Sequence, residues 1–83
     1  MNLIMIKKIK LIWDFRGPAA AKTAEHHTKH LKEYAKSKKL QFNISGVSHI
    51  NEMHSTAFLI VTEVEMLNVR DSLKPHRGEI YND

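Results

Sequence analysis

Residues 9–15 alternate between apolar and mostly polar side chains, and this pattern constrains the fold more than any other feature of the chain. The apolar side chains on one side of the segment are Ile9, Leu11, Trp13 and Phe15. A period of two residues is typical of a β-strand with one buried face. Gly17 and Pro18 follow, and proline is favoured at the first position of a helix. We therefore predict a strand that starts further upstream, near Leu3, and is followed directly by a helix.

The predicted first helix extends to about Lys38 and has one apolar stripe. The residues of this stripe, spaced at helical intervals, are Ala20, Ala24, Leu31 and Ala35. Residues 41–50 form a second β-prone segment, in which Gly46 is expected to create a bulge. Residues 51–54 fit a hairpin turn that leads into the next strand.

Residues 55–62 are the most β-prone stretch of the chain and are apolar on both faces. Thr62 and Glu65 have the spacing of a capping box, which predicts a second helix that ends before Pro75. The side chains expected to face the core from this helix are Met66, Val69 and Leu73. Residues 79–81 are predicted to form a short final strand.

The predicted order of elements is β-α-β-β-α-β, the ferredoxin-like pattern of an α+β domain spanning residues 1–83. Right-handed crossovers place both helices on one face of a four-stranded antiparallel sheet. The other face would be open to water, although Ile12 and one side of residues 55–62 are apolar there. A chain of 83 residues is small and buries a limited share of its surface. We therefore expect a homodimer that packs two open sheet faces together.

The composition excludes several kinds of site and partner. The chain has no cysteine, which excludes disulfides, thiolate metal ligands and cysteine nucleophiles. It has no serine in a nucleophile elbow and no glycine-rich phosphate loop. Residues 3–6 are too short an apolar segment for a signal peptide or a membrane span, so we expect a cytoplasmic protein without a membrane partner.

The net charge of +4 comes from scattered lysines, which favours a solvated surface over a nucleic-acid-binding patch. Residues 55–62 contain one aromatic side chain, Phe58, where an RNA-binding sheet presents a stacking pair. We therefore expect no nucleic-acid partner.

Three histidines lie close together in the predicted first helix, at His26, His27 and His30. On a helical wheel, His27, His30 and Tyr34 lie along one border of the apolar stripe, where polar tips can line a pocket. Because imidazole can transfer protons near neutral pH, His30 is a candidate acid–base residue in a cleft with Tyr34 on its wall. His27, which is nearest the stripe, fits either a packed core position or the wall of the same ligand site.

His26 and His30 are four residues apart, a spacing that can chelate a metal ion from one side of a helix. Glu33 follows three positions later. Two helical histidines form a weak pattern by themselves, so we predict neither a metal nor a cofactor. His26 and His30 are nevertheless the candidate ligands if a histidine cluster does bind metal.

The predicted topology brings several polar segments to one end of the sheet. These segments are residues 14–18, 52–54 and 74–78. Arg16 and Arg77 would lie there beside the amino end of the first helix, and two guanidinium groups suit a carboxylate or phosphate. His76 would be an auxiliary acid–base residue. The alternative is that both arginines pair with surface carboxylates, for which the candidates are Asp14, Glu52 and Glu79.

Three short motifs match a known family. They are Trp13-Asp14 at the end of the first strand, His30-Leu31 followed by Lys-Glu-Tyr, and residues 58–63 with 73–75 toward the carboxyl end. On these residues the chain resembles the YCII-related proteins of the dimeric α/β-barrel superfamily. The resemblance implies a dimer and a pocket in which a helical histidine, matched by His30, works with an aspartate just before the proline. Lys74 stands at the position of that aspartate, so Asp14 or Glu52 would have to replace it as a catalytic partner.

The leading functional hypothesis is a small homodimer that binds or transforms a small anionic organic molecule by histidine-mediated proton transfer. His30 would be the acid–base residue, with Arg16 and Arg77 as the anion clamp. One alternative is a structural or regulatory dimer without catalytic activity, and another is metal binding by the histidine cluster. The sequence leaves open whether the protein is an enzyme.

Overall fold

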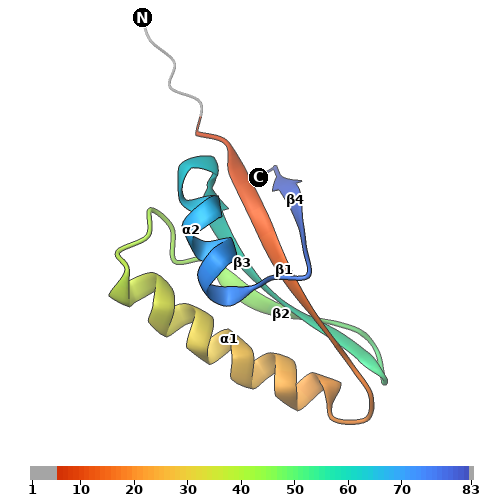
Figure 1. Ribbon diagram of the computed structural model, residues 1–83. Helices are drawn as coiled ribbons and strands as arrows, with labels where there is room; N and C mark the ends of the chain where they lie inside the picture. Colours follow the sequence, from red (N-terminus) through yellow and green to blue (C-terminus); the bar gives the residue numbers. More distant parts are fainter. Residues whose placement is uncertain (1–5, 83) are drawn as a thin grey trace, which may run out of the picture.

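The computed structural model describes residues 6–82, which form a four-stranded sheet with two helices on one of its faces (Figure 1). In chain order the elements are β1 (Lys8–Arg16), α1 (Ala20–Ser37), β2 (Ser45–Asn51), β3 (His54–Thr62), α2 (Glu63–Leu73) and β4 (Arg77–Tyr81). The strands lie in the order β2-β3-β1-β4, and all neighbours are antiparallel. The predicted α+β class and the β-α-β-β-α-β order of the ferredoxin-like pattern are confirmed.

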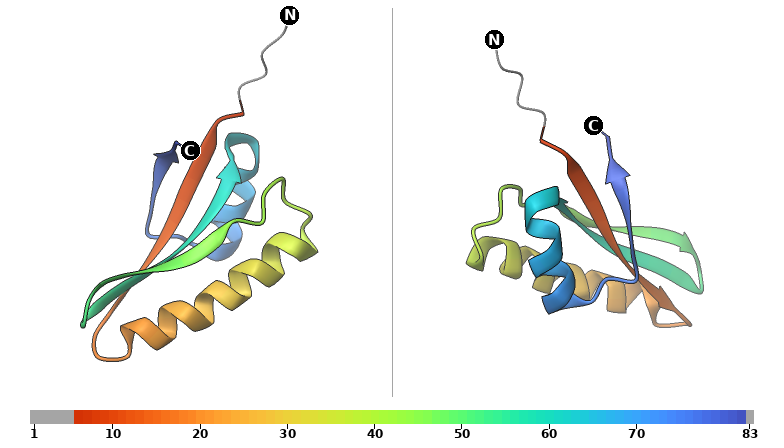
Figure 2. Two further views of the ribbon diagram at one scale, coloured as in Figure 1. Left: turned by 180° about the vertical axis from the view of Figure 1, so that it is seen from behind. Right: turned by 45° about the horizontal axis from the view of Figure 1, so that its top comes forward.

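The hydrophobic core lies between one face of the sheet and the inner sides of α1 and α2. Figure 2 shows how the two helices lie on the sheet from two further directions. Its buried members are Ile9, Leu11, Trp13, Leu31, Ala35, Ala57, Leu59, Val61 and Val69. The apolar alternation predicted for β1 is therefore confirmed. The indole Nε1–H of Trp13 donates to the carbonyl oxygen of Leu73 at 2.8 Å, which satisfies the polar atom of this buried ring and fixes the end of α2 against β1.

The four residues of the predicted apolar stripe of α1 are all buried, at most 2% exposed. Thr28 lies among them, and its hydroxyl donates to the carbonyl oxygen of Ala24 at 2.8 Å. After Ser37 the chain leaves the helix through Lys39, which has φ of +53°. This left-handed residue allows the Leu40 N–H to donate to the Ala35 carbonyl oxygen at 3.0 Å. Within residues 6–82, no helix is both long and apolar enough to cross a bilayer.

A capping box opens α2, as predicted. The Thr62 hydroxyl accepts the Glu65 N–H at 3.2 Å, and the Glu65 carboxylate accepts the Thr62 N–H at 3.0 Å. Of the three side chains expected to face the core from this helix, Val69 is buried and Met66 and Leu73 are partly buried against it. α2 thus covers the sheet with a single row of apolar residues.

The second strand differs from its prediction in length and in the position of its bulge. β2 begins at Ser45, later than predicted, and its irregularity lies between His49 and Asn51 instead of at Gly46. Gly46 pairs in register with Phe58, whose ring covers it so closely that a Cβ would lie 2.8 Å from Phe58 Cε2. A side chain at position 46 would therefore have to displace the aromatic ring of Phe58 on the neighbouring strand.

The other boundaries need smaller corrections. β1 begins at Lys8, and residues 6 and 7 are not part of a strand; the start predicted near Leu3 lies outside the described residues. β3 already begins at His54, which leaves Glu52 and Met53 as the turn of the predicted hairpin. β4 begins at Arg77, two residues earlier than predicted.

The sheet face opposite the helices carries apolar side chains, but neighbours in the same chain cover them. Ile12 is 3% exposed and Ile60 is fully buried. The Lys10 ammonium lies 4.6 Å from the centroid of the Phe58 ring, so a charged side chain lies across this face. The expectation that Ile12 would be open to water is wrong, and the predicted dimer through this face stays a prediction.

Candidate functional site

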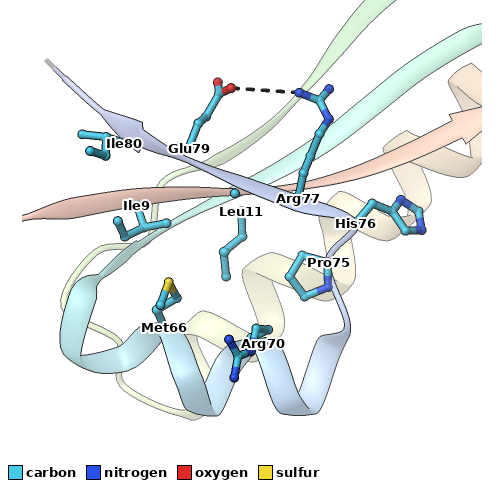
Figure 3. Close-up of a pocket in the computed structure, with 10 residues that line it drawn as sticks. Ile9, Leu11, Met66, Arg70, Pro75, His76, Arg77, Glu79 and Ile80 are labelled. Carbon is cyan, nitrogen blue, oxygen red and sulfur yellow. Dashed lines mark ion pairs between the residues drawn. The ribbon is translucent and has the colours of Figure 1, made fainter.

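A cavity of about 390 Å³ lies between α2 and the strands β1 and β4, on the face of the sheet that carries the helices (Figure 3). Its apolar lining consists of Ile9, Leu11, Met66, Pro75 and Ile80. Ligand sites in proteins measure roughly 300–1,000 Å³ and are mostly apolar with a few polar groups. The polar residues that border the cavity are Arg70, His76, Arg77 and Glu79, and of these His76 and Arg77 are site residues predicted from the sequence.

The cavity exists because β4 is a short edge strand that α2 covers incompletely. Gly78 pairs with Leu11 and contributes no side chain to fill the space between strand and helix. Ile80 pairs with Ile9 further along β4 and is 60% exposed, although it lies on the helix-covered face. An apolar surface that would ordinarily lie beneath a longer helix thus lines an open cavity.

Arg70 places a cation at the rim of this cavity from the last turn of α2. Its side chain is 54% exposed, and its Nε lies 3.6 Å from the carboxylate of Asp71, the next residue in the chain. Exposed ion pairs of this kind contribute little free energy. The guanidinium group of Arg70 therefore retains hydrogen-bond donors for the anionic group of a ligand.

A polar cluster of Asp14, His54 and Arg77 lies on the opposite face of the sheet. Arg77 donates to both carboxylate oxygens of Asp14, from Nε at 3.0 Å and from Nη2 at 3.2 Å. His54 Nε2 lies 2.8 Å from Asp14 Oδ1, and the side chains of His54 and Asp14 are only 14% and 18% exposed. In Figure 3 the side chains of Arg77 and Glu79 extend from β4 away from Met66 and Arg70, so they do not enter the cavity.

The charge state of Asp14 follows from these contacts. The hydrogen bonds from Arg77, and then the one with His54, lower the pKa of the Asp14 carboxyl from 3.8 to about 2. Asp14 is therefore ionised at neutral pH and neutralises the guanidinium group of Arg77. Within the described residues, His54 Nδ1 has no hydrogen-bond partner, so Asp14 orients the imidazole and leaves its second nitrogen unpaired.

His76 lies between the polar cluster and the cavity. Its backbone N–H donates to the Ile12 carbonyl oxygen at 2.9 Å, and its Nδ1 accepts the backbone N–H of Asp14 at 2.7 Å. These two bonds continue the pairing with β1 one residue before β4 begins. Because Nδ1 accepts, the proton of the neutral ring is on Nε2. In Figure 3 the ring extends past Pro75, away from Met66 and Ile80, so His76 borders the cavity without directing its ring into it.

Among the predicted site residues, Asp14, His76 and Arg77 come together, whereas Arg16 does not join them. Arg16 pairs with His54 at the end of β1, while Arg77 pairs with Ile12 further down the same strand. The predicted clamp of two arginines is therefore wrong. β4 starts beside the middle of β1, so the segment before it does not reach the end of the sheet.

The alternative interpretation of Arg77 agrees with the structure. Its guanidinium group pairs with Asp14, and Nη1 lies 4.0 Å from the carboxylate of Glu79. The other predicted neighbours at the end of the sheet do meet, because the Gly17 N–H donates to the Met53 carbonyl oxygen at 2.8 Å.

Within residues 6–82, His30 and Tyr34 do not share a cleft. The His30 side chain is 60% exposed, and its side-chain contacts among these residues are with His26 and Glu33. Tyr34 is partly buried against the core and lines a separate hollow between α1 and α2. Of the three residues at the border of the stripe, His27 and Tyr34 pack against the core, whereas His30 points into solvent. His30 has no cavity in which to act as an acid–base residue.

His27 packs into the core, as one of its two interpretations predicted. Its ring centroid lies 5.1 Å from that of Trp13 and 5.5 Å from that of Phe15. Its Nε2 is buried without a hydrogen-bond partner among the described residues. Burial lowers the pKa of His27, and the nearby imidazoles of His30, His76 and His26 lower it further. The alternative placement of His27 on the wall of a ligand cleft is wrong.

Two residues of the site were not predicted from the sequence. His54 was assigned to the hairpin turn, but a turn of only Glu52 and Met53 would have placed it in β3. Arg70 shares one side of α2 with Met66, four residues earlier, and this helical spacing was the available signal. The cavity itself has no sequence signal, because it depends on how far α2 extends over β4.

Comparisons with models of protein families, with curated proteins and with solved structures found no match to this chain. The resemblance to the YCII-related proteins consequently stays a prediction. A function for this chain therefore rests on the geometry of its cavity and of the polar cluster on the opposite face of the sheet.

Proposed function

We propose that the chain binds a small amphipathic organic anion in the cavity between α2 and β4. The observation that supports this proposal is an apolar cavity of about 390 Å³ with a weakly paired arginine, Arg70, at its rim. The hydrocarbon or aromatic part of the ligand would contact Leu11, Met66 and Ile80. Its anionic group would accept hydrogen bonds from Arg70.

The available donors favour a ligand with a single carboxylate. Arg77 is occupied by Asp14 in a two-point contact, which leaves Arg70 as the nearest cation with weakly used donors. One hydrogen bond between charged groups contributes about 1.5–3 kcal/mol before ordering costs. Burial of an apolar chain would add about 25 cal/mol per Å² of apolar surface removed from water.

Binding, rather than proton transfer, is the activity that the geometry supports. His30 is 60% exposed, and Lys74, at the position where the YCII-related family has its aspartate, is an exposed residue in a left-handed conformation. Membership of that family remains our proposal, supported by the shared order of elements and by the short motifs. Its proposed catalytic pair is not part of the function we assign.

Calorimetric titration with sodium octanoate below its micelle concentration tests the proposal. Arg70→Gln should weaken binding by about tenfold, since it removes one charge-assisted contact. Arg16→Gln is the matched control, because it removes the same charge from a residue that does not line the cavity. Equal affinity of these two variants, or no binding by the parent chain, would overturn the proposal. Amide shifts of Met66 and Ile80 on titration would locate the ligand.

We also propose that the chain forms a homodimer through the open face of the sheet, which would support a structural or regulatory role. The small size of the chain and the partly exposed Phe58 at the centre of this face support the dimer. Ile44 and Ile50, before and within β2, are 39% and 56% exposed and enlarge the apolar surface of the chain. Light scattering at micromolar concentration gives the mass, and a single-chain mass would exclude the dimer.

A further inference from the structure

A second group of side chains, separate from the cavity, lies on the exposed surface of α1. His26 and His30 are one helical turn apart, and their rings meet edge to face with centroids 4.7 Å apart. Their Nε2 atoms are separated by 3.1 Å. We propose that His26 and His30 chelate a divalent late transition-metal ion through these two Nε2 atoms.

The separation of the two nitrogens suits a shared ion. With metal–nitrogen distances of about 2.0–2.1 Å, two ligands lie about 2.9 Å apart at a right angle and about 3.3 Å apart at the tetrahedral angle. The observed 3.1 Å between the Nε2 atoms falls between these values. Both side chains are exposed, so they can rotate to admit the ion without displacing a buried residue.

Glu33 favours the form of His30 that binds metal. Its carboxylate lies 3.3 Å from His30 Nδ1, on the ring edge opposite the proposed ion. A proton on Nδ1 faces this carboxylate, which favours the tautomer of His30 with a lone pair on Nε2. Without an ion, neutral His26 can donate its Nε2–H to that lone pair. When the ion binds, this proton passes to water and His26 takes up a proton from water on Nδ1, so that His26 changes tautomer and no net proton is released.

The site uses two protein ligands, and water or a second molecule completes the coordination. Within residues 6–82 no group of three or more histidine, aspartate and glutamate side chains is arranged to hold one ion. Glu33 is not a third ligand, because it faces the other nitrogen of His30. For such a nitrogen site the expected order of affinity is Cu²⁺ above Ni²⁺ above Zn²⁺ at neutral pH, following the usual order for these ions.

Titration of the untagged chain with NiCl₂, ZnCl₂ and CuCl₂ tests the inference. We expect one site, with a stoichiometry of one ion per chain or one ion per two chains. His26→Ala and His30→Ala should each weaken Ni²⁺ binding by at least about tenfold, because two linked ligands bind far more tightly than either alone. Glu33→Gln should weaken Ni²⁺ binding less than either alanine variant, because it removes a neighbour of His30 and not a ligand of the ion.

The matched control keeps the histidine content constant. The double variant His30→Ala, Lys32→His retains six histidines, the number in the parent chain, but places the second imidazole on another side of α1. It should bind Ni²⁺ as weakly as His30→Ala. Affinity equal to that of the parent chain would overturn the proposal, because binding would then depend on histidine content and not on this pair.

Discussion

Asp14 shows at the scale of one residue how a carboxylate stabilises a junction between distant segments. Its side chain contacts Arg77 and His54, and its N–H donates to His76. These partners come from β4, from β3 and from the segment that precedes β4. Because its pKa is lowered to about 2, Asp14 stabilises the fold when it is ionised.

Replacing this carboxylate should reduce stability in a pH-dependent way. The stability supplied by a lowered carboxyl pKa is complete above the unfolded value of 3.8 and is lost as the pH falls toward 2. With the discount that the half-exposed Arg77 requires, we expect Asp14→Asn to lower the free energy of unfolding at pH 7 by about 1 kcal/mol. Urea denaturation between pH 7 and pH 2 measures this. Asp71→Asn is the control, because Asp71 is exposed. This variant should change the pH dependence of the free energy of unfolding little.

His27 is the residue at which packing and protonation conflict. Its ring lies against Trp13 and Phe15, and its buried Nε2 lacks a partner within the described part of the chain. The folded state therefore favours the neutral imidazole. The unfolded chain takes up a proton near the ordinary pKa of 6.5, which the folded chain resists. The contribution of neutral His27 to the free energy of unfolding is complete above pH 6.5 and decreases as the pH falls below that value.

The variant His27→Leu should remove this dependence. Leucine fills a similar space and has no nitrogen to protonate, so the free energy of unfolding should decrease less between pH 7 and pH 5 than in the parent chain. His49→Leu is the control, since His49 is 51% exposed. Thermal denaturation across this pH range is the measurement. If the free energy of unfolding of His27→Leu decreased with falling pH as steeply as that of the parent chain, burial of His27 would not be the cause of the loss of stability in acid.

At the scale of elements, both helices end in lysines with unfavourable backbone conformations. Lys39, just after α1, has φ of +53°, and Lys74, at the end of α2, has φ of +50°. Glycine adopts this conformation without strain, whereas other residues lose roughly 1 kcal/mol. Both side chains are exposed, so neither is required for packing.

We expect Lys39→Gly and Lys74→Gly each to raise the free energy of unfolding by about 0.5–1 kcal/mol. Lys32→Gly, in the interior of α1, should lower it by about 1 kcal/mol, because glycine is a poor helix former. Urea denaturation at pH 7 distinguishes the three variants. If all three destabilised the chain, the lysine side chains would have to make contributions that outweigh their backbone strain.

The elements could be predicted where the determining residues are neighbours in sequence. The alternation of β1 and the capping box of Thr62 and Glu65 are local patterns, and both are confirmed. The role of Gly46 could not be predicted, because it depends on the ring of Phe58 in another strand. A single-residue shift of register would place that ring elsewhere, and register is not readable from one strand alone.

The candidate site was predictable only in part, for the same reason. The sequence identified Asp14, His76 and Arg77 as polar residues near one another. It could not specify that Arg77 lies beside Ile12 and away from Arg16, because this depends on where β4 starts along β1. The helical wheel placed His30 correctly on α1, but it could not distinguish which residues at the border of the stripe pack against the core and which face solvent.

At the scale of the whole molecule, the open face of the sheet has an excess of positive charge. By strand register it carries Lys8, Lys10, Arg16 and Arg77 against Asp14 and Glu79. Two such faces in a symmetric dimer would repel each other at low salt. The apolar surface that the centre of this face could bury in a dimer would come mainly from Phe58, because Ile12 and Ile60 are already buried within one chain.

These properties determine how the proposed dimer should respond to salt and to mutation. Raising NaCl from 50 mM to 500 mM should strengthen dimerisation, because screening reduces the repulsion between the two positive faces while apolar contacts persist. Phe58→Glu should give a single-chain mass in light scattering and retain its helical circular dichroism. Val64→Glu is the matched control, since Val64 lies on α2 and is 89% exposed, and this variant should remain dimeric. A dimer that dissociates at high salt would instead be held by ion pairs, and the open face would not be its interface.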